Sequence, residues 1–157
     1  MVVSENLLKW LLRLYPPLFF QRIWVVKINN GFAGARVKIS HSLLNRNYNK
    51  SIFGGTIFSA ADPFYPALFH QVLSKKGYHI KVWSRSVEVQ FLKPGLTNLY
   101  FDLVITEQEI VEIVNLLDTV GKYVQAHPID IYNIDGKKCV SLMIEVHIRN
   151  LNFIEIT

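Results

Sequence analysis

One long segment constrains the fold of this chain more than any other. From Thr56 to Lys75 the sequence is dense in Ala, Phe and Leu and is apolar nearly all round. A helix that is hydrophobic on every side is buried inside its domain. Most of the remaining sequence has the character of β-strand. These two features predict an α+β fold with one buried helix among several long antiparallel strands.

The strands are recognised by β-rich composition and by turn residues between them. Asp135-Gly136 is the strongest short hairpin signal in the chain, and Asn29-Asn30-Gly31 marks a second turn. The sequence Thr-Glu-Gln-Glu at 106–109 is a capping box that predicts a short helix to about Asp118. The predicted strands are 24–28, 35–40, 81–91, 97–105, 123–132 and 139–149.

The first twenty residues predict an amphipathic helix that extends the domain. Ser4 is the expected N-cap, and the prolines at 16–17 are the expected stop. Glu5, Lys9 and Arg13 form a polar stripe, so no stretch reaches the roughly 20 apolar residues that span a bilayer. No cleavage site of a signal peptide follows. We expect this helix to pack on the domain or on a neighbouring subunit, with peripheral contact to a membrane as the alternative.

Composition limits the class of protein. The 157 residues suit one domain, 1–157, and half of them are hydrophobic while only 18% are charged, which favours a homo-oligomer. A single cysteine, Cys139, excludes a disulfide framework and favours a cytoplasmic chain. The net charge of +5 favours an anionic partner. Nucleic acid is not expected, because no basic run, zinc-finger spacing or RNP-like motif is present.

Known catalytic and metal motifs are lacking. The sequence has no P-loop and no G-x-S-x-G, and its five histidines are too scattered to predict a metal site. The unusual residue is Asp62, a carboxylate within the apolar segment. Asp62 could cap a helix that begins with Pro63. Alternatively, the helix begins at Gly54-Gly55, Asp62 lies two turns along it, and Pro63 kinks it. The residues alone leave both interpretations open.

The run 53–62, Phe-Gly-Gly-Thr-Ile-Phe-Ser-Ala-Ala-Asp, resembles the hotdog thioesterases of the phenylacetyl-CoA type. In that family the helix opens with His-Gly-Gly and carries an acid seven residues after the second glycine. Three further segments, Tyr15-Pro16-Pro17, Asn45-Arg46-Asn47-Tyr48 and Phe91-Leu92-Lys93-Pro94-Gly95, are similar to a bacterial branch of the superfamily known as a domain of unknown function (DUF4442-like). The resemblance implies a hotdog fold, in which a long central helix is wrapped by a curved antiparallel sheet, with an added N-terminal helix and assembly as a homodimer or homotetramer.

The resemblance also implies an activity, the hydrolysis of an acyl-CoA thioester, with no cofactor beyond the coenzyme A of the substrate. Asp62 would be the general base or nucleophile. Backbone N–H groups around Gly54, Gly55 and Thr56 would polarise the thioester carbonyl, as unpaired donors at a helix N-terminus can. In this superfamily the acid and the donors come from opposite subunits of a dimer, so a monomer would be inactive. The histidine of His-Gly-Gly is Phe53 here, and Asn47 or Asn49 would then hold the attacking water.

Candidate substrate contacts are of two kinds. Cations beside the strands would meet the phosphates of coenzyme A, although such residues also commonly protect strand edges: Lys81, Arg85, Lys93 and Lys38. Aromatic side chains would line an acyl tunnel, although they are also ordinary core residues: Phe58, Phe64, Tyr65, Phe69 and Trp83. Three alternatives to hydrolysis remain: a non-catalytic acyl-ligand binding protein, a hydratase, and a membrane-associated assembly protein.

Overall fold

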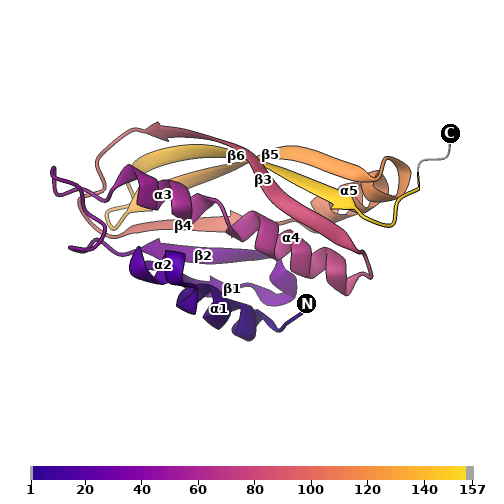
Figure 1. Cartoon of the computed structure of the whole chain (residues 1–157). Helices are drawn as coiled ribbons and strands as arrows, with labels where there is room; N and C mark the ends of the chain where they lie inside the picture. The colour runs from indigo at the N-terminus through magenta and orange to yellow at the C-terminus, as the bar shows by residue number, and fades with distance from the viewer. Residues whose placement is uncertain (1, 155–157) are drawn as a thin grey trace.

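A computed structural model, which describes residues 2–154, contains one antiparallel sheet of six strands (Figure 1). The strand order is β1-β2-β4-β5-β6-β3, so β1 and β3 are the two edges. Every neighbouring pair is antiparallel. The strands are β1 (Ile23–Ile28), β2 (Gly34–Ile39), β3 (Ile80–Phe91), β4 (Leu99–Val104), β5 (Lys122–Asn133) and β6 (Lys138–Asn150). The six strands predicted from the sequence are therefore confirmed, with small shifts at their ends.

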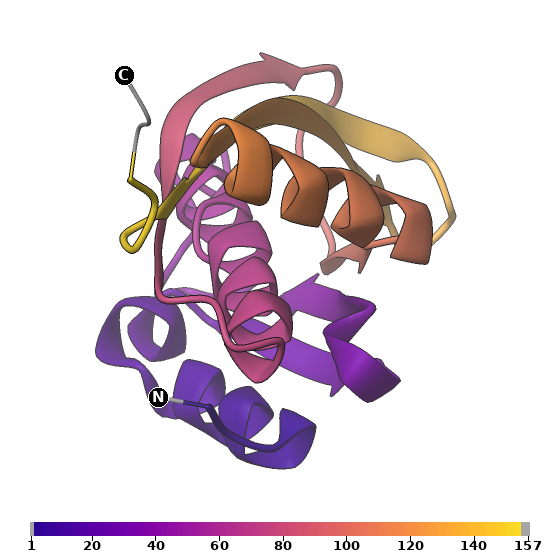
Figure 2. The same ribbon diagram turned by 90° about the vertical axis from the view of Figure 1, so that its right-hand side faces the viewer.

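The helical segments are α1 (Glu5–Leu14), α2 (Pro16–Phe20), a 3-10 turn η1 (Asn30–Phe32), α3 (Gly54–Ala61), α4 (Phe64–Lys75) and α5 (Glu107–Thr119). Figures 1 and 2 show the sheet curving round α3 and α4, which together form the predicted central helix. This helix begins at Gly54, and Asp62 is the C-cap of α3 in helical conformation. Pro63 lacks an N–H and therefore breaks the helix between α3 and α4. The second of the two interpretations of Asp62 is the correct one.

The core lies between α3 and α4 and the concave face of the sheet. On β6 every second side chain from Val140 to Ile148 faces the core as predicted, and each of these five apolar side chains is at most 1% exposed. Phe64, Leu68 and Phe69 of α4 are equally buried. Phe64 packs edge to face with Phe101 of β4 at 6.1 Å between ring centroids. Burying this surface is the main force that holds the helix inside the sheet.

The N-terminal segment folds as two helices rather than one. Ser4 caps α1 as predicted, since its hydroxyl accepts the N–H of Leu7 at 3.2 Å. The prolines at 16–17 end α1 but also open α2, because proline suits the first positions of a helix. Both helices contact β1. Among residues 2–154, no helix is long and apolar enough to cross a membrane.

The helix α5 lies where β4 and β5 separate. These strands pair only at Leu99↔Asn133 and Tyr100↔Tyr132, and α5 follows β4 and packs on β5. Thr106 caps α5 through the N–H of Glu109 at 3.1 Å, as predicted. The carboxylate of Glu109, however, contacts Nδ1 of the buried His127 on β5 at 3.1 Å. The Glu109 side chain therefore contacts the sheet, whereas in a capping box it would accept a hydrogen bond from the backbone N–H of Thr106.

Replacing Glu109 by alanine is expected to lower the free energy of unfolding by about 1–3 kcal/mol, because both ring nitrogens of buried His127 would then lack a partner. Urea denaturation would measure this difference. Glu107→Ala, in the same turn and exposed, is the matched control. Equal effects of the two substitutions would show that the Glu109–His127 contact does not hold α5 on the sheet.

Candidate functional site

The first turn of α3 carries unpaired backbone donors. Phe53 is its N-cap and makes no side-chain cap hydrogen bond. The N–H of Thr56 donates to the Phe53 carbonyl at 2.9 Å. Among the described residues, the N–H groups of Gly54 and Gly55 donate to no other group. These two N–H groups are the ones available to a developing negative charge, at the end of a helix where the macrodipole favours an anion.

Aromatic rings lie over both glycines. A Cβ on Gly55 would collide with the ring of Phe53, and a Cβ on Gly54 would lie 3.0 Å from Cζ of Phe91. Phe53 lays its ring against the first turn of α3. The ring is 57% exposed, so it lies at the surface.

Clefts flank this turn on two sides. One cleft, of about 350 Å³, is lined by Gly54, Asn47, Phe91 and Lys93 among others. The other, of about 580 Å³, is lined by Phe53, Gly55, Thr56 and Ser59 together with parts of the 44–46 loop. Of the predicted site residues, the structure brings six together at this turn: Asn47, Phe53, Gly54, Gly55, Thr56 and Lys93. It adds Phe91 and Ser59, which the sequence did not single out.

Asp62 lies at the far end of α3 and is exposed. The hydroxyl of Ser84 on β3 donates to the Asp62 carbonyl at 3.0 Å, which ties this residue to the edge strand. Seven residues separate Asp62 from Gly55, a rise of roughly 10 Å along a helix. A carboxylate must come within about 3 Å of the reacting group to act on it. Asp62 therefore cannot serve the donors of its own helix.

Two asparagines of the loop before α3, Asn45 and Asn47, form hydrogen bonds that stabilise the loop. Oδ1 of Asn47 accepts the N–H groups of Asn49 and Ser51 at 3.0 and 3.2 Å, and also the Ser51 hydroxyl at 3.1 Å. This leaves only the amide N–H₂ of Asn47 to face the cleft. Asn49 is exposed and lines neither cleft beside the glycines. Neighbouring Asn45 is buried, and its amide donates to the carbonyls of Gln21 and Ser40.

The predicted aromatic residues do not lie together. Phe64, Tyr65 and Phe69 are buried in the core, whereas Phe58 and Trp83 are exposed. Tyr65 stacks on Phe69 at 5.9 Å between centroids and lies 4.6 Å from the ring of His127. Burial, and secondly the charge of Glu109, raises the pKa of Tyr65 to about 12. Tyr65 is a neutral core residue away from both clefts.

The predicted cations are also divided. Lys93 lines the cleft beside Gly54. Arg85 occupies a bulge in β3 and contacts Glu145 on the outer face of the sheet, with 3.4 Å between Nε and Oε1. Lys81 is exposed on β3, and Lys38 lies 6.0 Å from the ring centroid of Tyr100. Of the four predicted cations, Lys93 is therefore the one placed beside the glycines.

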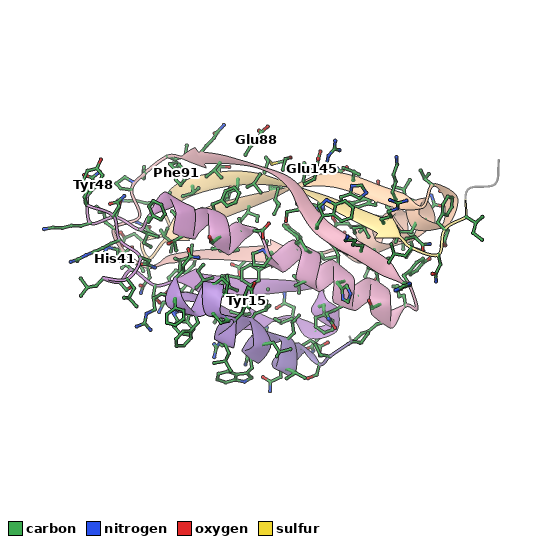
Figure 3. The ribbon with its side chains drawn as sticks, viewed as in Figure 1. Tyr15, His41, Tyr48, Glu88, Phe91 and Glu145 are labelled. Atoms are coloured by element: carbon green, nitrogen blue, oxygen red, sulfur yellow. The ribbon has the colours of Figure 1, made fainter. Side chains whose placement is uncertain are left out.

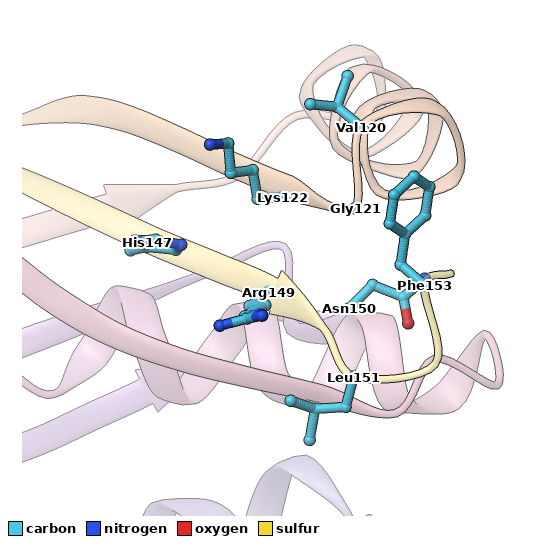
Figure 4. A pocket seen from close by; sticks show the side chains of 8 residues that line it. All are labelled: Val120, Gly121, Lys122, His147, Arg149, Asn150, Leu151 and Phe153. Carbon is cyan, nitrogen blue, oxygen red and sulfur yellow. The ribbon is translucent and has the colours of Figure 1, made fainter. Parts of the chain in front are cut away.

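A cationic cleft of about 510 Å³ lies elsewhere, at the ends of β5 and β6, and was not predicted (Figure 4). Lys122, His147 and Arg149 contribute its basic side chains. The His147 ring stacks on Trp83 at 4.1 Å between centroids. Burial, and secondly the charges of Arg85, Lys122 and Arg149, lowers the pKa of His147 below its ordinary value. His147 is therefore neutral near pH 7 and leaves the positive charge of this cleft to its neighbours.

The Lys122→Gln substitution is expected to raise the pKa of His147 toward the usual histidine value, because one repelling charge is removed. Titration of the ring by NMR would measure the shift. Glu145→Gln is the opposite control and should lower this pKa further, since Glu145 favours the charged ring. A pKa of His147 unchanged in both variants would contradict the electrostatic cause.

Within residues 2–154, no cluster of three or more histidine, cysteine or acidic residues could hold a metal ion. His41, one of the scattered histidines, has its Nε2 2.6 Å from the carbonyl of Lys50 in the 41–53 loop.

A curved antiparallel sheet around a helix that begins with two glycines defines a hotdog fold. The family model described as a domain of unknown function (DUF4442) matches residues 4–148, and the chain belongs to this family. No curated protein matches the sequence.

Solved structures share the fold at low sequence identity. A Pseudomonas aeruginosa protein of unknown function, described as a "probable thioesterase", is 11% identical with a TM-score of 0.84 and covers 96% of this chain and 98% of its own. A Haemophilus influenzae thioesterase is 11% identical with a TM-score of 0.71, covering 99% and 97%. The E. coli PaaI protein from the phenylacetic acid degradation operon is 16% identical with a TM-score of 0.59, covering 92% and 95%.

Proposed function

We propose that this protein hydrolyses acyl-CoA thioesters. The observation that carries the proposal is the pair of unpaired N–H groups of Gly54 and Gly55 at the start of α3, between two clefts. Such donors, fixed before reaction, stabilise the oxyanion that forms when a thioester carbonyl is attacked. The thioesterases among the similar structures are consistent with this reaction.

In the proposed reaction Asp62 supplies the base. The carboxylate takes a proton from water, the water oxygen attacks the carbonyl carbon, and the oxyanion is held by the glycine N–H groups. The carbon–sulfur bond then breaks, and the departing coenzyme A thiolate takes up a proton. Direct attack by the Asp62 carboxylate, followed by hydrolysis of the anhydride, would use the same groups. Either route requires Asp62 and the glycines to meet at one substrate.

A homodimer joined at β3 would meet this requirement. The strand β3 is an edge strand that pairs only with β6, and its apolar side chains are incompletely covered. Pairing two β3 edges would remove the exposed edge and form one continuous sheet. Asp62 is tied to β3 through Ser84, so the acid of one subunit would lie near the partner. In this dimer, Lys93 is our candidate for contact with a phosphate of coenzyme A.

Release of free thiol from short, long and aromatic acyl-CoAs tests the proposal directly. We expect turnover on at least one class by the wild-type protein. A folded oligomer that releases no thiol from any substrate would overturn the proposed hydrolysis.

One observation favours a second function, the binding of an acyl ligand without turnover. The Phe53 ring packs on Gly55 and places an apolar surface where the related family has histidine. An acyl ligand retained on purification, together with no thiol release, would support this alternative. Phe53→His that creates hydrolysis in an inactive wild type would identify the ring as the cause.

A further inference from the structure

The helix α1 is docked with its apolar side outward. Its stripe Leu7, Trp10, Leu11 and Leu14 has the spacing of one helical face, and each of these side chains is between 46% and 64% exposed. The domain is contacted by Leu8, which is 8% exposed, and by half-buried Leu12. A surface helix normally turns its apolar stripe toward the core. This helix does the opposite.

Polar contacts fix this orientation. Glu5 accepts the N–H of Gly31 at 3.2 Å and lies 3.5 Å from Nζ of Lys75. On the same side, Nε of Arg13 donates to the carbonyl of Val25 at 2.7 Å. Glu5 and Arg13 of the polar stripe therefore hold the helix on the domain, and rotating the apolar face inward would break these contacts.

The exposed stripe continues into the next helix. Tyr15 is 53% exposed between α1 and α2, where Figure 3 labels it, and Phe20 at the end of α2 is 66% exposed. We call Leu7, Trp10, Leu11, Leu14, Tyr15 and Phe20 the N-terminal apolar face. Figures 1 and 2 show both helices side by side at one border of the molecule, outside β1. A group of exposed apolar side chains on two neighbouring helices marks an interaction site.

The charge around this face is positive. Residues 1–61 contain eight Lys or Arg and a single acid, Glu5, a formal charge of +7, whereas residues 62–157 contain nine Lys or Arg and eleven acids, a formal charge of −2. Beside the indole of Trp10 lie Lys9 at 5.8 Å and Arg13 at 5.0 Å from the ring centroid. Neither cation has an ion-pair partner among residues 2–154. Glu5, the one acid nearby, is already paired with Lys75.

We propose that the N-terminal apolar face docks on the surface of a bilayer that contains anionic phospholipid. The apolar stripe would enter the boundary between headgroups and acyl chains, Trp10 would lie at that boundary, and Lys9 and Arg13 would meet lipid phosphates. A second copy of the chain fits less well, because a two-fold contact would oppose two cationic borders with no free acid between them. Ten residues of helix are about 15 Å long, half the thickness of the hydrocarbon core, so α1 would lie on the surface.

This face is separate from the proposed dimer edge. The face borders β1, and the dimer edge is β3 at the other end of the sheet order. Membrane docking therefore does not rest on thioester hydrolysis, and each can fail alone.

Sedimentation of the full-length protein with lipid vesicles tests the proposal. We expect binding to vesicles of phosphatidylcholine with about 30% phosphatidylglycerol, weaker binding to phosphatidylcholine alone, and loss of the difference in high salt. The double variant Trp10→Gln, Leu14→Gln should reduce the partition coefficient by at least about tenfold, since two apolar side chains no longer enter the lipid. Val111→Gln, Ile134→Gln is the matched control, because these side chains are 61% and 60% exposed on α5 and in the β5–β6 turn, outside α1 and α2.

A second readout follows Trp10 itself. In a Trp24→Phe, Trp83→Phe background, its fluorescence should shift to the blue with anionic vesicles and be quenched by brominated lipid. Wild-type protein that binds neither kind of vesicle would overturn the proposal, as would binding that the Trp10 and Leu14 changes leave intact. Self-association in the absence of lipid that these changes abolish would instead identify a second copy as the occupant.

Discussion

The Asp62→Asn variant is expected to hydrolyse acyl-CoA with a kcat about 10²–10⁴-fold below that of the wild type, because a positioned base typically contributes this much to catalysis. The side chain keeps its shape and loses only its basicity. Asp62 is exposed and its backbone holds the structural contact with Ser84, so the fold should be unaffected. Thiol release at saturating substrate would measure the loss.

Asp102→Asn is the control for this result. Asp102 is also an exposed aspartate, paired with Arg36 at 3.4 Å on the surface, where an ion pair contributes little. Equal kcat values for wild type and Asp62→Asn would remove the acid from the mechanism. A parallel loss in Asp102→Asn would show that the assay responds to surface charge rather than to the site.

The Gly54→Pro variant is expected to lower kcat by about 10²–10³-fold, the usual effect of losing one oxyanion donor. Proline removes the N–H of Gly54 while leaving the rest of the backbone in place. Gly54 is the first residue of α3, a position that proline favours. Phe53, with φ −59° and ψ 132°, already has the conformation that a residue before proline adopts. Circular dichroism of the purified variant would check that the fold is kept, and steady-state kinetics would measure the loss of kcat.

Gly54→Ala separates the loss of the donor from crowding. Alanine keeps the N–H but adds a Cβ 3.0 Å from the exposed ring of Phe91, which can move. The loss of kcat is expected to be much smaller in Gly54→Ala than in Gly54→Pro.

Mixing Asp62→Asn subunits with Gly54→Pro subunits should restore about a quarter of the wild-type activity. Half of the dimers would then contain one subunit of each kind, and each of these dimers would hold one intact site out of two. If mixing restores no activity, Asp62 and the glycine N–H groups of one site would belong to the same subunit.

Features set by neighbours in sequence could be predicted from the sequence. The alternation along β6 and the Asp135-Gly136 turn, with Gly136 at φ 73°, depend on residues a few positions apart. The ambiguity at Asp62-Pro63 had a physical reason, because a helix start and a helix break use the same two residues. Only the structure shows that the helix begins at Gly54.

Other site features depend on contacts distant in sequence. Arg85 was expected near the substrate, but the bulge between Ser84 and Ser86 disrupts the alternation of β3 there, and Arg85 instead contacts Glu145 on the outer face. The amide of Asn47 could bind water, yet its Oδ1 accepts hydrogen bonds from Asn49 and Ser51 of the same loop. The outward orientation of the apolar side of α1 could not be predicted either, because periodicity shows that a helix has an apolar side but not whether that side faces the core or the solvent.

The short contact between β4 and β5 divides the sheet into two halves. Two residue pairs join β1-β2-β4 to β5-β6-β3, whereas β5 and β6 are paired along nearly their whole length. Regions with few ladder hydrogen bonds open locally at a lower free energy than the strands on either side. The seam between β4 and β5, covered by α5, is therefore the place where the sheet can flex, widening or narrowing the space around the central helix without unpairing either half.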